Sequence, residues 1–107
     1  MATYANTSYV AKNVGTSASS LVTVPSGTIA ISSLVVSNTS ASPITANVYF
    51  TRSAVDYYIV KSATIAVGGS LEAIAGNRVV LIASDTLKVS TSAATSADCV
   101  VSALTAV

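Results

Sequence analysis

The sequence is poor in the side chains that carry most enzyme chemistry. It contains no histidine, one cysteine and only four carboxylates, which stand apart from one another at Asp56, Glu72, Asp85 and Asp98. General acid–base catalysis needs titratable groups within hydrogen-bond reach of each other and of the substrate. Zinc sites need cysteine and histidine, and calcium sites need clustered oxygen ligands. We therefore expect no enzyme, no metal site and no cofactor.

Charge is also scarce. Charged residues make up 8% of the chain, where an ordinary soluble domain has about 25%. The run from Asn13 to Thr51 carries none at all. The five cations are scattered along the chain, at Lys12, Arg52, Lys61, Arg78 and Lys88. They form no basic stripe, so we expect no nucleic-acid binding. A net charge of +1 gives little repulsion between copies and permits their association.

Long apolar segments are missing too. No stretch of about 18 uninterrupted apolar residues could span a bilayer, and the first residues lack the apolar segment of a signal peptide. We therefore expect no membrane segment, and we expect synthesis in a cytoplasm.

The single cysteine, Cys99, lies beside apolar residues in DCVVSAL and cannot form a disulfide within the chain. It is expected to be a small buried hydrophobic residue.

What the sequence does contain is abundant alanine, valine, serine and threonine, with valine, threonine and tyrosine favouring strands. Period-two alternation is clearest in ITANVYFTR, residues 44–52, and predicts a half-buried strand. Its expected core face consists of Ile44, Ala46, Val48 and Phe50. In TIAISSLVVSN the apolar phase slips near Ser32 and Ser33, which predicts a β-bulge.

Turn signals recur about every 8 to 12 residues, and no helical apolar period persists. The cluster NTSASP at 38–43 predicts a hairpin, as does the pair Gly68 and Gly69. Turns are also expected at PSG (25–27) and at AGN (75–77). These signals predict about nine short strands in an antiparallel β-sandwich, either immunoglobulin-like or jelly-roll-like, over residues 20–107. Residues 1–19 are expected to form an N-terminal arm or a first edge strand.

Aromatic residues supply the candidate interface. Adjacent Tyr57 and Tyr58 must point to opposite faces of a strand, so we expect one ring in the core and the other outside. Arg52 and Asp56 flank a short connection and are expected to pair across it. The candidate interface residues are Tyr4, Tyr9, Tyr49, Tyr57, Tyr58 and Arg52.

Edge strands of soluble monomers are usually protected by lysine, proline or inward charges. Between Asn13 and Thr51 only Pro25 and Pro43 could do this. We therefore infer that edges or one sheet face are covered by another chain in the working state.

Two segments resemble the small β-sandwich structural proteins of tailed bacteriophages, especially those of cyanobacterial and marine hosts. They are TVPSGTIAISSLVVSNTSASPITANVYF and YYIVKSATIAVGGSLEAIAGNRVVLIASDTLKVSTS. In that family a TVP-x-G turn leads into a SLVVSN strand, and a late turn and strand precede the terminal strand. The resemblance covers Leu21 to Thr105 and departs at Ser84, where the family usually has glycine before the aspartate that matches Asp85.

The resemblance implies a virion protein assembled in the host bacterial cytoplasm, present in many copies. Its partners would be other copies of itself and other virion proteins. A capsid decoration or cement protein bound to the major capsid protein is the leading hypothesis. A neck or tail connector, or a fibre-associated structural protein, is the alternative. A third hypothesis is a module that binds host glycans through Tyr49, Tyr57 or Tyr58.

Overall fold

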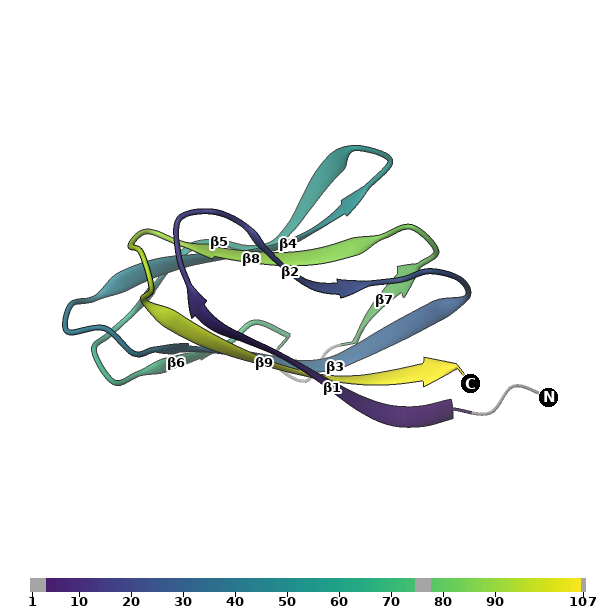
Figure 1. Ribbon diagram of the computed structural model, residues 1–107, viewed down its shortest axis with the longest axis horizontal. Helices are drawn as coiled ribbons and strands as arrows, with labels where there is room; N and C mark the ends of the chain where they lie inside the picture. Colours follow the sequence, from purple (N-terminus) through teal and green to yellow (C-terminus); the bar gives the residue numbers. More distant parts are fainter. Residues whose placement is uncertain (1–3, 75–77, 107) are drawn as a thin grey trace.

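A computed structural model describes residues 4–74 and 78–106 and shows two antiparallel β-sheets packed face to face (Figure 1). The predicted all-β sandwich is therefore confirmed. The turn predicted at AGN, 75–77, lies outside the described residues. Within the described ranges, no helix has the length and apolarity needed to cross a membrane.

Nine strands are formed by the described residues. Sheet A has the order β1 (Tyr4–Val14), β9 (Ala97–Ala106), β3 (Thr28–Asn38) and β6 (Ser70–Glu72), and β7 (Val79–Ile82) also pairs with β3. Sheet B has the order β2 (Ser19–Thr23), β8 (Thr86–Thr91), β4 (Ile44–Arg52) and β5 (Val55–Ile65). Residues 4–14 therefore form an edge strand along β9.

Most successive strands lie in opposite sheets. Of the two predicted alternatives, immunoglobulin-like and jelly-roll-like, this arrangement is the jelly roll. Two predicted hairpins are therefore wrong. The connection at 38–43 leads from β3 in sheet A to β4 in sheet B, and Gly68–Gly69 leads from β5 in sheet B to β6 in sheet A. Turn residues reverse the chain, but they do not determine which sheet the next strand joins.

The core between the sheets is aliphatic. The residues of β4 alternate as predicted, with Ile44, Ala46 and Val48 buried. The predicted bulge in β3 is confirmed by a register shift between Ile31 and Ser33, which keeps apolar side chains facing the core on both sides of it. Cys99 is buried in this core, as expected.

Asn38 is a buried polar residue that holds one end of the sandwich together. Its side-chain nitrogen donates hydrogen bonds to the carbonyl oxygens of Ser42 at 2.9 Å and Ile65 at 3.1 Å. Its side-chain oxygen accepts from the backbone nitrogen of Ser40 at 2.9 Å and from the hydroxyl of that residue at 2.7 Å. One amide therefore fixes the β3–β4 connection against the end of β5.

We expect Asn38→Ala to lower the free energy of unfolding by about 2–3 kcal/mol, because it leaves several of these groups without their partner. Urea denaturation monitored by circular dichroism measures the change. The neighbouring exposed Thr39→Ala serves as the control and should change stability by less than about 0.5 kcal/mol. Equal stabilities of the two variants would contradict this role of Asn38.

Candidate interaction surfaces

The β4–β5 hairpin projects from the sandwich on the side of sheet B that faces away from sheet A (Figure 1). Its strands pair from Arg52↔Val55 onward, so Ser53 and Ala54 form a two-residue turn. Both turn residues have positive φ, 52° and 63°, a conformation that tight hairpin turns require and that asparagine or glycine usually supplies. We call residues 49–58 the hairpin tip.

Aromatic rings pair across the hairpin tip on both of its faces. Tyr49 and Tyr58 have ring centroids 4.9 Å apart, and Phe50 and Tyr57 are stacked at 5.4 Å. Burial raises the pKa of the Tyr49 phenol, and the charge of Asp56 raises it further, so this phenol stays protonated at neutral pH.

The expectation that one ring of the Tyr57–Tyr58 pair enters the core is wrong. Tyr57 is 48% exposed and Tyr58 is 47% exposed. The two residues do lie on opposite faces, because Tyr57 pairs with Phe50 and Tyr58 with Tyr49. The hairpin tip, however, projects beyond the region where the two sheets pack together, so each ring is covered by its cross-strand neighbour and, for Tyr58, by the Lys61 ammonium 5.0 Å from the ring centroid. Val55 in the same tip is 50% exposed.

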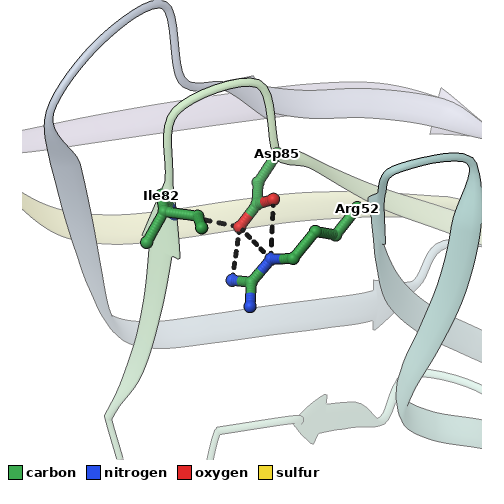
Figure 2. Close-up of polar contacts among 3 residues, drawn as sticks. All are labelled: Arg52, Ile82 and Asp85. Atoms are coloured by element: carbon green, nitrogen blue, oxygen red, sulfur yellow. Dashed lines mark hydrogen bonds and ion pairs between the residues drawn. The ribbon is translucent and has the colours of Figure 1, made fainter.

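Arg52 ties the hairpin tip to the turn between β7 and β8 (Figure 2). Its Nε donates to Oδ1 of Asp85 at 2.9 Å, and its Nη2 lies 2.6 Å from Oδ2. The Asp85 side chain is 1% exposed and also accepts a hydrogen bond from the Ile82 backbone nitrogen at 2.9 Å. The hydrogen bonds from Arg52 lower the pKa of Asp85 below its usual value, and the bond from Ile82 adds to this.

The expected pairing of Arg52 with Asp56 is therefore wrong. Asp56 instead accepts a hydrogen bond from the Thr51 hydroxyl at 2.8 Å. Asp85 lies 33 positions from Arg52 in the sequence, and only the fold brings the two together. Ser84, where the phage-like pattern has glycine, has a positive φ of 74°, so a serine occupies a position that glycine would favour.

The outer face of sheet A, which points away from sheet B, carries two rows of apolar side chains, and the Lys12–Asp98 ion pair, 3.4 Å apart, lies beside one of them. Pairing of the strands places side chains in rows across this face. One row contains Val10, Val100 and Val35, and another contains Leu104, Ala30 and Val80. Val10 is 75% exposed, and Val80 and Val100 are each 49% exposed. Antiparallel sheets commonly bury one face and keep the other polar, so this face departs from that pattern.

Between these two rows runs a row of serines, Ser8, Ser102 and Ser33. Their short side chains leave a hollow of about 340 Å³, lined by Asn6, Thr7, Ser8, Ser32, Ser102 and Ala103. The Ser32 hydroxyl donates to the Ser102 carbonyl oxygen at 3.1 Å. We call this hollow the serine trough. Its floor carries hydroxyl groups, and the rows beside it carry aliphatic side chains together with Asn6 and with Glu72, which accepts a hydrogen bond from the Ser33 hydroxyl at 2.8 Å.

The outer face of sheet B differs from that of sheet A. Its paired residues on β4 and β8 are polar or amphipathic: Thr45, Asn47, Tyr49, Thr51, Thr86, Lys88 and Ser90.

The apolar rows of sheet A were not predicted from the sequence, although the sequence contains a signal for them. The runs LVV, CVV and VVLI are continuous rather than alternating, which is typical of strands covered on both faces.

The structure separates the predicted interface residues into two groups. Tyr4 and Tyr9 lie on β1 in sheet A, where Tyr9 packs partly against the core. Tyr49, Tyr57 and Tyr58 lie together on the hairpin tip in sheet B, and Arg52 anchors that tip. The six residues therefore do not form one continuous interface on a single chain.

We expect Arg52→Met to lower the melting temperature by about 5–10 °C at neutral pH, because it leaves the Asp85 carboxylate buried without its cation. Lys61→Met is the matched control, because Lys61 on β5 is exposed and, like Arg52, lies over an aromatic ring. It loses only this contact, worth about 0.5–1 kcal/mol at an exposed site, and should lower the melting temperature less than Arg52→Met does.

The deficit of Arg52→Met should shrink in acid. In the wild type the folded pKa of Asp85 is lowered, so its contribution is complete above the ordinary carboxyl pKa and is lost as the pH falls through the lower folded value. In the variant, burial raises the pKa of the unpaired carboxyl, and acid relieves its desolvation penalty. A deficit that does not change with pH would contradict the ion pair as its cause.

Comparison with known proteins gives a structural likeness only. No protein-family profile matches the chain, and no curated protein matches it in sequence. Among solved structures, the chain is similar to one described under the heading "Bacillus endospore appendages form a novel family of disulfide-linked pili". The TM-score is 0.62 at 12% identity, and the match covers 100% of this chain and 91% of the other.

This likeness shows a shared β-sandwich fold and no phage relative. The resemblance to tailed-phage structural proteins is therefore wrong, and with it the capsid decoration role, the virion location and the major capsid protein as partner. The strand and turn patterns that suggested phage proteins belong to small β-sandwiches in general.

Proposed function

We propose that this chain is a non-enzymatic structural subunit that assembles with copies of itself into a fibre. The observation that carries the proposal is the apolar outer face of sheet A. Val10, Val80 and Val100 are each about half exposed or more, and the row of Val10, Val100 and Val35 stays apolar until it reaches Glu72 on β6. Contiguous apolar surface of this kind marks an interaction site in soluble proteins.

The fold supports the same proposal. The similar solved protein forms pili on Bacillus endospores, according to its description, and 91% of its chain aligns with this chain. An appendage on a spore or cell surface is the location that this likeness favours. The charge content supports it as well, because desolvating serine, threonine and alanine costs less than desolvating lysine or glutamate.

The edge strands β1 and β5 carry more protection against pairing with another chain than the sequence analysis inferred. On β1, Lys12 stands next to a register shift between Ala11 and Val14. On β5, Lys61 stands next to Ser62, which has a positive φ of 54°. A lysine combined with a local irregularity is a common protection against pairing with another strand. This favours contact through the sheet A face over contact through these two edges.

The proposed assembly is non-covalent. The pili of the similar protein are described as disulfide-linked, whereas this chain has one cysteine. Cys99 is 1% exposed, and burial raises the pKa of its thiol to about 12. A buried, protonated thiol reacts slowly, because the thiolate is the reactive form. One cysteine could in any case join only two copies.

The purified chain is expected to form elongated polymers at tens of micromolar, visible by negative-stain electron microscopy and sedimentation velocity. Val100→Lys places a charge in the apolar face and should suppress polymers while leaving the circular dichroism spectrum unchanged. A wild-type chain that stays a monodisperse monomer under these conditions would overturn the proposed function.

Assembly should be the same with and without a reducing agent, and Cys99→Ala should assemble like the wild type. Thiol labelling with Ellman's reagent should be slow in the native protein and rapid in denaturant. Polymers that dissolve on reduction would show that the contact is covalent and that Cys99 is more than a buried core residue.

A further inference from the structure

We infer that the hairpin tip of one copy docks in the serine trough of the next copy, and that this head-to-tail contact extends the fibre. The inference rests on the proposed function and names the two surfaces that meet. The exposed large apolar and aromatic side chains of the hairpin tip are Val55, Tyr57 and Tyr58. The serine trough, with its rims of Val10, Val100 and Val80, lies on the outer face of sheet A.

The two surfaces cannot meet within one chain. The hairpin tip rises from sheet B (Figure 1). The serine trough is lined by residues of β1, β3 and β9 in sheet A, and its exposed Ser8 and Ser102 alternate with residues that face the core. Each copy therefore carries one of each, and both are left unoccupied in a single copy. A contact between two different surfaces does not close on itself unless its rotation makes a ring, so it generates an open-ended assembly.

The surfaces match in chemistry. A tyrosine ring is apolar along its body and polar at its hydroxyl, and such rings are enriched at protein interfaces. In the serine trough, the valine rims would cover the ring body. The hydroxyls of Ser8, Ser32 and Ser102 would lie at the position of the phenol. A floor of serines also loses little side-chain entropy on ordering.

Charged residues near the two surfaces could set the orientation in which the hairpin tip enters the serine trough. The hairpin tip carries the exposed carboxylate of Asp56. Arg78 is exposed and directly precedes β7, whose Val80 lies in one of the apolar rows, while Glu72 lies at the end of the other row. Opposite charges at the margin of an interface fix its register more than they add to its affinity.

The hairpin tip is also held in one shape before binding. Its strands are joined by two ring pairs, at 4.9 and 5.4 Å, and its end is tied to buried Asp85 by Arg52. A preorganised anchor loses less conformational entropy on association, and a few central aromatic side chains commonly carry most of the binding energy.

Two variants test the contact. Tyr57→Thr combined with Tyr58→Thr removes both exposed rings from the tip and keeps a strand-favouring residue at each position. Ser102→Lys fills the trough with a long charged side chain. Each should raise the critical concentration for polymer formation about tenfold or more, the effect of losing one dominant interface side chain.

Each variant has a matched control. Val67→Thr changes a residue that is 54% exposed but lies outside the tip, and Thr64→Lys adds a charge on β5, outside the trough. Both controls should assemble like the wild type. Melting curves of all four variants should show the cooperative transition of a folded protein, since every changed side chain is exposed.

Mixing the two defective variants gives the decisive result. The tip variant keeps an intact trough and the trough variant keeps an intact tip, so equal amounts should form a discrete heterodimer by sedimentation velocity, without longer polymers. A polymer contact in which the serine trough binds some surface other than the hairpin tip predicts a different outcome: the tip variant polymerises normally and the mixture gives no discrete heterodimer. That outcome overturns the inference while leaving the proposed function standing. A wild-type chain that does not polymerise overturns both.

Discussion

The thin aliphatic core between the two sheets is the constraint on which the other features depend. Its buried apolar residues are valine, leucine, isoleucine, alanine and Cys99, and none of the aromatic side chains that the structure describes is among them. Packed sheets lie about 10 Å apart, and short side chains fill that space without rings. The rings are consequently displaced to the hairpin tip, where they stack on one another, and to Tyr9 at the edge of the core.

Strands that alternate between sheets require connections over the ends of the sandwich, and buried polar groups stabilise those connections. Asn38 holds the end of β3, Asp85 holds the turn before β8, and the Thr91 and Ser96 hydroxyls meet at 2.7 Å where the chain leaves β8 for β9. Each of these residues is buried and hydrogen-bonded. In a core with few large side chains, such anchors supply the specificity that packing alone does not.

Much of the fold could be predicted from the sequence because alternation is a local property. The faces of β4 and the bulge in β3 follow directly from the positions of their apolar residues. The sheet that each strand joins could not be predicted, because glycines and turn residues show where the chain reverses but not which strand the next one pairs with. The Arg52–Asp85 ion pair could not be predicted either, because the two residues are distant in sequence and only the strand arrangement brings them together. The apolar face of sheet A had a signal in the runs LVV and VVLI, but β1 lacked one, because its core-side residues include Thr7 as well as Tyr9.

A fibre joined by unlike surfaces has polarity, which follows from the opposite placement of the hairpin tip and the serine trough. At one end the last subunit presents a free aromatic hairpin, and at the other it presents a free apolar sheet face. The two ends then expose different surfaces and can grow at different rates, although a subunit that adds at either end forms the same contact. A protein that anchors such a fibre to a surface would need to imitate only one of the two surfaces, and its choice would set which way the fibre points.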